Sequence, residues 1–166
     1  TGPASFQNVD GGMLPRDFVA QLVAELGQRE EKPVRLGDDQ LDFLARVVDH
    51  FEEVLRERQA GRVPRQRVFL LLGQGDSGKS EIINIVRKAS DKYVRVGGVL
   101  AMASTNSAAR GIGGDTIHSC IHWHGDAGLS LEQLSKRVTP ELKDKWRDVE
   151  LLVVDEISLV QTRSSE

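Results

Sequence analysis

Gly73-Gln74-Gly75-Asp76-Ser77-Gly78-Lys79-Ser80 is the stretch that decides the fold of this 166-residue chain. It fits the pattern G-x-x-x-x-G-K-[ST], in which glycines let the backbone wrap closely around an anionic group. The apolar run Val68 to Leu72 before it predicts a strand, and Glu81 to Ala89 after it predicts a helix. The helix N-terminus and the backbone N–H groups together favour bound phosphate. The order of strand, loop and helix therefore indicates a phosphate-binding loop (P-loop).

The residue types in this loop indicate how it would bind a nucleoside triphosphate. Lys79 would reach the β- and γ-phosphates, and the hydroxyl of Ser80 would ligate Mg²⁺. The other residues of the loop that we expect to bind the nucleotide are Gly75, Asp76, Ser77 and Gly78. We therefore expect ATP and Mg²⁺ as ligands. The alternative is a glycine-rich turn that is followed by a lysine by chance and binds no phosphate.

A second stretch, Leu151-Leu152-Val153-Val154-Asp155-Glu156, has four apolar residues ending in two carboxylates. Such a run predicts a strand buried on both faces of a parallel sheet, with its acidic end at the carboxyl edge where ligands bind. Asp155 fits the carboxylate that holds Mg²⁺, and Glu156 fits the general base for the attacking water. A strand ending in solvated acids is the alternative. The two stretches together predict an α/β P-loop NTPase with a parallel sheet flanked by helices.

The composition is that of an ordinary globular chain with 39% hydrophobic and 28% charged residues, long enough for one sizeable domain. A net charge of −3 argues against a protein that coats nucleic acid, because such proteins are usually strongly basic. It does not exclude the binding of nucleic acid along a local track of the surface. No stretch is apolar for long enough to span a membrane. The arginines before the first predicted strand favour a solvated linker and are Arg56, Arg58, Arg62, Arg65 and Arg67.

The first 36 residues predict a flexible lead-in, Thr1 to Gly12, and a short amphipathic helix that ends at Gly27. The apolar positions of that helix are Leu14, Phe18, Leu22 and Leu26. Residues 37–166 predict the ATPase domain, which begins with a long helix capped by Asp38 or Asp39. The apolar stripe of the long helix is Leu41, Leu44, Val48, Phe51 and Leu55. On pattern alone, Gln40 is a solvated residue of its first turn.

The second half of the chain predicts a strand over Val94 to Ala103 and a helix over Leu129 to Trp146 that is interrupted by Pro140. Between them lies a run of metal-ligating residue types: His118, Cys120, His122 and His124. We favour histidines that are satisfied locally or face nucleic acid over a metal site, because no second ligand pair has the usual spacing. The lone cysteine cannot form an internal disulfide, which suits a reducing compartment.

Four segments, in this order, resemble the PIF-type helicases (petite integration frequency), superfamily-one relatives of RecD. Gly73 to Ser80 is similar to helicase motif I, and Ser104 to Ala109 is similar to motif Ia. Gly111 to Ser119, which contains Gly-Gly-x-Thr-Ile-His-Ser, is similar to the DNA-contacting motif that follows. Asp155-Glu156-Ile157-Ser158 is similar to motif II. The resemblance covers the chain from roughly Leu36 onward.

The resemblance implies a RecA-like domain of an ATP-dependent DNA helicase that moves 5′-to-3′ along single-stranded DNA in DNA repair and recombination. Such a protein would be intracellular, in the nucleus or mitochondrion of a eukaryote. Gln40 falls where the family carries an adenine-contacting glutamine. The residues that would face single-stranded DNA are Thr105, Thr116 and His118. The loop departs from the family in having Asp76-Ser77 for the usual Gly-Thr, and a carboxylate there would weaken nucleotide binding unless it pointed outward or towards the metal.

The resemblance further implies parts that this sequence, which stops soon after Ser158, does not include. In the family the ATP site lies between two RecA-like domains, and the arginine finger comes from later motifs; here the second domain or a partner chain would supply it. A strand that follows motif II lies between the P-loop strand and the Asp-Glu strand. We therefore expect a partial RecA-like domain. The alternatives are a non-motor nucleotide-binding interaction module and another P-loop ATPase, such as an AAA-type remodeller or a kinase.

We expect the 166-residue chain alone to hydrolyse ATP poorly or not at all. The reason is that an arginine finger is worth ~10³–10⁵ in rate, and we expect none within this sequence. Steady-state ATP turnover by the purified chain measures this. Turnover near that of a complete helicase would contradict the expectation.

Overall fold

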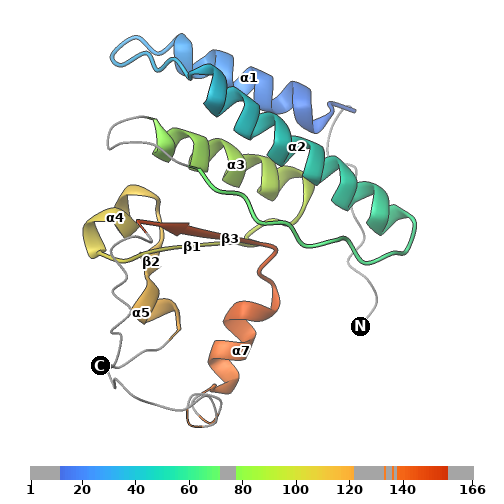
Figure 1. Cartoon of the computed structure of the whole chain (residues 1–166), viewed down its shortest axis with the longest axis vertical. Coiled ribbons are helices and arrows are strands. Elements are labelled where there is room, and N and C mark those ends of the chain that lie inside the picture. The colour runs from blue at the N-terminus through green and yellow to red at the C-terminus, as the bar shows by residue number, and fades with distance from the viewer. Residues whose placement is uncertain (1–11, 72–77, 122–132, 134–135, 137, 157–166) are drawn as a thin grey trace, which may run out of the picture. The chain divides into compact units, whose positions relative to one another are not determined.

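The structure is a computed structural model that describes residues 12–71, 78–121, 133, 136 and 138–156. Its contacts divide the chain into two compact units, Thr1–Val94 and Arg95–Glu166. The first unit is helical and the second holds a parallel sheet (Figure 1). The fold is therefore α/β, as the sequence predicts.

The first unit contains three helices, α1 (Pro15–Gly27), α2 (Asp38–Gln59) and α3 (Lys79–Tyr93), and each packs against the other two (Figure 1). Their facing stripes form an apolar core, and full burial of each large aliphatic side chain contributes about 1.5–3 kcal/mol. The buried core residues are Val19, Leu22, Leu26, Leu44, Val47, Val48, Phe51, Val54, Ile82, Ile85, Val86 and Ala89.

The structure confirms the predicted amphipathic helix, which is α1, and confirms that it ends at Gly27. Leu14 lies outside the core because it precedes the first helical turn and is 55% exposed. Phe18 packs edge-on against Tyr93 with 5.8 Å between ring centroids, and the ammonium of Lys92 lies 4.4 Å from the Phe18 ring centre. Aromatic and cation–π contacts of this kind fix α1 against the last turn of α3.

Helix α2 begins one residue earlier than an aspartate cap would require. Its N-cap is Gly37, so Asp38 and Asp39 lie in the first turn, where their charge favours the positive end of the helix. The predicted apolar stripe is partly wrong: Leu41 is 40% exposed, whereas Val47 is buried. The reason is that α2 packs against two helices, which bury a wider face than a single apolar stripe provides.

The strand predicted over Val68 to Leu72 is not present in the part of it that the structure describes. Residues 68–71 have no strand assignment, and the side chains of Val68 and Leu70 are 90% and 72% exposed. An apolar run becomes a strand only when a neighbouring strand satisfies its backbone groups. The described residues supply no such neighbour to this segment.

The second unit is built on a three-stranded parallel sheet of order β2-β1-β3, from β1 (Val99–Ala103), β2 (Asp115–Thr116) and β3 (Leu151–Asp155). The predicted strand over Val94 to Ala103 is therefore too long at its start, because a turn with Gly97 at φ +71° separates α3 from β1. Strand β3 is confirmed but not buried on both faces, since Leu152 is 42% exposed.

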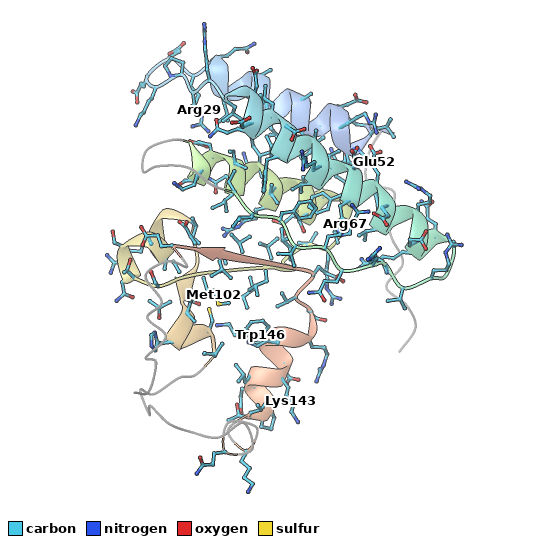
Figure 2. The ribbon with its side chains drawn as sticks, viewed as in Figure 1. Arg29, Glu52, Arg67, Met102, Lys143 and Trp146 are labelled. Atoms are coloured by element: carbon cyan, nitrogen blue, oxygen red, sulfur yellow. The ribbon has the colours of Figure 1, made fainter. Side chains whose placement is uncertain are left out.

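Helices α4 (Asn106–Gly111) and α5 (Ile117–Cys120) pack against β1 and β2, and α7 (Pro140–Arg147) precedes β3. Pro140 is the first residue of α7, where its missing N–H is not needed, and residues 138 and 139 before it are not helical. Most of the helix predicted before Pro140 lies outside the described residues. The indole N–H of Trp146 donates to the backbone carbonyl of Cys120 at 3.2 Å and so ties α7 to α5 (Figure 2).

Gly114, just before β2, passes unusually close to β1. A Cβ atom built on Gly114 would lie 2.3 Å from the carbonyl oxygen of Ala101 and 2.7 Å from its carbonyl carbon. No side chain fits there without a shift of backbone. The neighbouring Gly113 has φ +60°, a left-handed conformation that favours glycine. The close packing at Gly114 and the left-handed backbone at Gly113 therefore explain why both positions are glycine.

Replacement of Gly114 by alanine should lower the free energy of unfolding by about 3 kcal/mol, the cost of forcing a methyl group into a packed site. Gly111→Ala is the matched control, because a Cβ at Gly111 meets nothing within 4 Å. Alanine in that helical position should stabilise the chain by about 0.5 kcal/mol. Urea denaturation followed by circular dichroism measures both. Equal stability of the two variants would contradict the close approach.

Candidate nucleotide and nucleic-acid site

The end of the phosphate-binding loop lies at the start of a helix, as the sequence predicts. Gly78 is the N-cap of α3 with φ +82°, and Lys79 and Ser80 are its first two residues. The N–H groups of a first helical turn precede the helical hydrogen-bond ladder and carry partial positive charge. Lys79 is half-buried and Ser80 is exposed. Residues 72–77, with Gly75, Asp76 and Ser77, lie outside the described residues.

Gln40 lies beside this helix start. A Cβ atom at Gly78 would be 3.7 Å from Nε2 of Gln40, 3.6 Å from Leu36 and 3.8 Å from Val34. The side-chain carbonyl of Gln40 accepts the backbone N–H of Gly37 at 2.9 Å. Gln40 therefore orders the first turn of α2, and the same contact holds its amide next to the end of the phosphate-binding loop.

Val34 and Leu36 belong to the surroundings of the candidate site but were not predicted from the sequence. Both are half-buried, and they alternate along the extended segment between α1 and α2. Alternate residues of extended backbone point to the same side, so both side chains meet Gly78 together. The available signal was the spacing of two apolar residues just before Gln40.

In the second unit, three predicted site residues lie at the same edge of the sheet. Thr116 ends β2 and Asp155 ends β3, and both pair in register with Ala103 at the end of β1. With strands about 4.8 Å apart, the backbones of Thr116 and Asp155 are separated by about 10 Å. Thr105 follows β1 and begins α4. This carboxyl edge is where parallel sheets bind their ligands.

Both threonines cap helices through their side-chain oxygens. The hydroxyl oxygen of Thr105 accepts the N–H of Ala108 at 3.2 Å, and that of Thr116 accepts the N–H of Ser119 at 3.2 Å. A threonine hydroxyl can accept these bonds and still donate its own proton. For Thr105 the recipient of that proton is Oε2 of Glu156, at 3.5 Å.

Glu156 has a backbone conformation that glutamate rarely adopts, with φ +52°. Its N–H donates to Oδ1 of Asp155 at 2.9 Å, which orients the Asp155 carboxylate from the next residue. Left-handed backbone at a non-glycine residue costs roughly 1–3 kcal/mol and concentrates at functional sites. The side chain of Glu156 is exposed, so its carboxylate is accessible to a water molecule.

His118 and Cys120 do not form a shared site, because His118 is exposed and Cys120 is fully buried. Burial raises the pKa of the Cys120 thiol, so the buried side chain behaves as a small apolar residue. His122 and His124 lie outside the described residues, and no group of three or more metal-ligating side chains occurs within the described ranges.

The donor set that the sequence assigns to Mg²⁺ fits that ion chemically. The Ser80 hydroxyl and the Asp155 carboxylate are hard oxygen ligands, and Mg²⁺ is commonly held by one or two protein oxygens together with phosphates and water. Ser80 belongs to the first unit and Asp155 to the second. Ser80 lies in the first turn of α3, and Asp155 is the last residue of β3.

Two of the clustered arginines are paired with glutamates of the first unit. Arg62 contacts Glu57 at 2.5 Å, and Arg67 contacts Glu53 at 2.7 Å (Arg67 is labelled in Figure 2). These contacts support the interpretation of a charged, solvated segment. Across the part of the chain that the structure describes, no helix combines the length and apolarity needed to cross a membrane.

The family described as "AAA domain" matches residues 58–166, which is more than half of the chain. Curated relatives support the PIF-type resemblance. "ATP-dependent DNA helicase PIF1" of Candida albicans is 37% identical over 91 residues, which are 53% of this chain and 10% of that protein. "ATP-dependent DNA helicase RRM3" of Saccharomyces cerevisiae is 32% identical over 111 residues, 63% of this chain and 15% of that protein.

A bacterial relative gives the same result. "ATP-dependent DNA helicase Pif1" of Campylobacter jejuni is 33% identical over 105 residues, 60% of this chain and 23% of that protein. The chain thus spans less than a quarter of the length of these relatives. No solved structure matches the chain significantly.

Replacement of Thr105 by alanine should lower the free energy of unfolding by about 1 kcal/mol, because α4 loses its N-cap. Thr105→Ser retains the hydroxyl and should stay within about 0.5 kcal/mol of the wild type. Urea denaturation of both variants measures the difference. An alanine variant as stable as the serine variant would show that the cap at Thr105 does not form in solution.

Proposed function

Because this chain belongs to the AAA domain family, we propose that it is the ATP-binding part of a DNA helicase that moves 5′-to-3′ along single-stranded DNA. The observation that carries the proposal is the shared edge of the sheet in the second unit. There the register brings Thr116 and Asp155 to either side of Ala103, and Thr105 meets Glu156. Residues suited to contact DNA and residues suited to hydrolyse ATP are therefore neighbours.

In the first unit, the start of α3 would hold the triphosphate. Lys79 and the first-turn N–H groups would supply positive charge for the phosphates, and the Ser80 hydroxyl in the same turn would be a ligand for Mg²⁺. The amide of Gln40, beside Gly78, would contact the adenine ring. When bound, Mg²⁺ would neutralise charge on the β- and γ-phosphate oxygens.

In the second unit, Asp155 and Glu156 would divide the work of hydrolysis. Asp155 would be the carboxylate ligand of Mg²⁺, with one oxygen already held by the N–H of Glu156. Glu156 would orient the attacking water and accept its proton. Glu156 follows the last residue of β3 in a left-handed backbone conformation, and its carboxylate lies 3.5 Å from the Thr105 hydroxyl.

We also propose Thr105, Thr116 and His118 as contacts to the DNA backbone, because hydroxyl and imidazole groups commonly bind phosphate oxygens. The Thr105 hydroxyl has one proton, which Glu156 accepts at 3.5 Å. A DNA phosphate at Thr105 would compete for that proton and release the glutamate for water. This arrangement offers a direct way for DNA to stimulate hydrolysis.

The complete site would need a second RecA-like domain or a partner chain to supply an arginine finger. Since the chain spans less than a quarter of its helicase relatives, motor activity is a proposal for the assembled protein. A nucleotide-binding module without motor activity is the rival interpretation. It predicts ATP binding that single-stranded DNA does not influence.

Lys79→Ala should weaken Mg·ATP binding by roughly 10- to 100-fold, because the phosphates lose a charged hydrogen-bond donor. Glu156→Gln should leave ATP affinity within about twofold, because its role lies in the chemical step. Lys88→Ala is the matched control, an exposed lysine of the same helix. Fluorescence titration with a labelled ATP analogue measures all three. Unchanged binding by the Lys79 variant would contradict the nucleotide site.

The DNA part of the proposal is tested with a fluorescent single-stranded oligonucleotide and with ATP turnover in its presence. We expect the oligonucleotide to bind and to raise whatever turnover the wild-type chain has, and Glu156→Gln to abolish that increase. Binding of ATP without any response to DNA would favour the non-motor module.

A further inference from the structure

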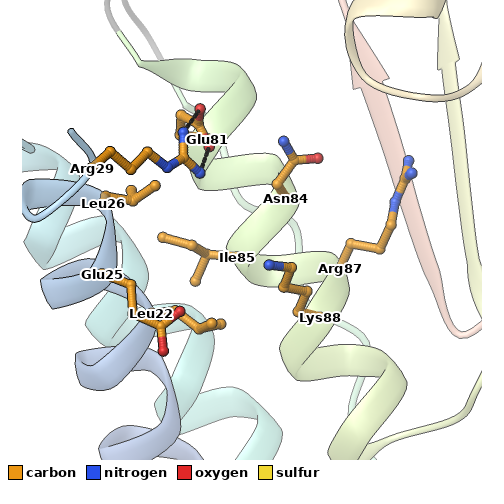
Figure 3. Close-up of a pocket in the computed structure, with 9 residues that line it drawn as sticks. All are labelled: Leu22, Glu25, Leu26, Arg29, Glu81, Asn84, Ile85, Arg87 and Lys88. Carbon is orange, nitrogen blue, oxygen red and sulfur yellow. Dashed lines mark hydrogen bonds and ion pairs between the residues drawn. The ribbon is translucent and has the colours of Figure 1, made fainter. Parts of the chain in front are cut away.

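Arg29 lies in the loop after α1, and its guanidinium forms a two-pronged ion pair with Glu81. Nη1 donates to Oε1 at 2.6 Å, and Nη2 donates to Oε2 at 3.2 Å (Figure 3). Glu81 directly follows Ser80 in the first turn of α3. Arg29, which precedes α2 in the sequence, thus contacts the first turn of α3, directly after the phosphate-binding loop.

The loop that carries Arg29 is anchored on both sides. Leu22 and Leu26 of α1 are buried, and the N–H of Val34 closes the loop by donating to the carbonyl of Leu26 at 2.9 Å. The guanidinium of Arg29 is charged, as arginine always is in proteins, and the hydrogen bond to Glu81 raises its pKa further. The position of the cation therefore depends on the packing of α1 against α3.

A carboxylate in the first turn of α3 has two opposite effects. It stabilises the helix, because the helix N-terminus is the positive end of its dipole. It also opposes a bound phosphate, because both anions use the same positive end. Glu81 is adjacent in sequence to Ser80, so its charge would bear directly on a nucleotide there.

We propose that Arg29 is a positioning residue for the nucleotide site, which neutralises Glu81 and holds its carboxylate to the side of α3 that faces α1. This inference rests on the proposed ATP site. It assigns to α1 and its following loop, which precede the family match at residues 58–166, a role in setting nucleotide affinity.

The test compares Mg·ATP binding by the wild-type chain, Arg29→Ala, Glu81→Gln and the double variant. Removal of Arg29 leaves an uncompensated anion and should weaken binding by about two- to fivefold, the size of charge effects at a helix terminus. Glu81→Gln leaves an extra cation and should tighten binding by a similar factor. The double variant should return to within about twofold of the wild type.

The opposite signs separate an electrostatic role from a structural one. If the pair served only to hold α1 in place, all three variants would lose the same contact and bind ATP equally badly. The differences among the variants should also shrink between about 0.1 M and about 1 M salt, because the screening length falls from about 10 Å to about 3 Å.

Arg16→Ala is the matched control. Arg16 also forms a two-pronged ion pair, to Glu52 at 3.0 and 2.7 Å, and it joins the first turn of α1 to α2 (Glu52 is labelled in Figure 2). Its removal should change stability about as much as removal of Arg29 but leave ATP affinity unchanged. Urea denaturation of every variant shows whether it is folded, and Glu81→Gln tests the sign of the effect without removing Arg29.

The outcomes separate this inference from the proposed function. If the wild-type chain does not bind Mg·ATP, the proposed nucleotide site is wrong and the inference falls with it. If the wild type binds but Glu81→Gln does not tighten binding, or Arg16→Ala weakens it as much as Arg29→Ala, only the positioning role is overturned.

Discussion

The backbone of Gly114 and the carbonyl of Ala101 approach so closely that no side chain can stand between them. This contact draws the chain against β1 immediately before the two residues of β2. It therefore fixes where β2 begins, and from there the register places Thr116 beside Ala103, on the side opposite Asp155. A short strand with few hydrogen bonds gains its register from this steric constraint. The proposed meeting of DNA and ATP chemistry at one sheet edge depends on it.

The first unit reaches a comparable result by helix packing. Elements that precede the phosphate-binding loop in the sequence surround the start of α3: Gln40 comes from α2, and Arg29 follows α1. Each of these side chains also has a structural task, as a first-turn hydrogen bond or an ion pair. Two of the proposed DNA contacts, Thr105 and Thr116, likewise cap helices. In both units, groups that order the local backbone are the groups proposed to meet ligands.

The sequence predicted the elements whose signals are local. The helix after the loop, β3 and its two acids, and the end of α1 at Gly27 follow from periodicity and turn residues. The strand over Val68 to Leu72 failed in its described part because a strand needs a hydrogen-bonding neighbour, which composition cannot supply. The burial of Val47 depends on two packing partners, and the ion pair of Arg29 joins residues far apart in sequence. These are properties of tertiary contacts.

The left-handed backbone at Glu156 has a consequence for how this chain could be altered. Asparagine and glycine adopt that conformation more readily than glutamate does. Selection for heat resistance alone would therefore favour them at position 156 and would discard the carboxylate. The proposed role of the Glu156 carboxylate in turnover thus opposes the thermal stability that another residue would give at this position. A mutant library designed to raise the thermal stability of the protein should therefore keep Glu156 unchanged and vary other positions.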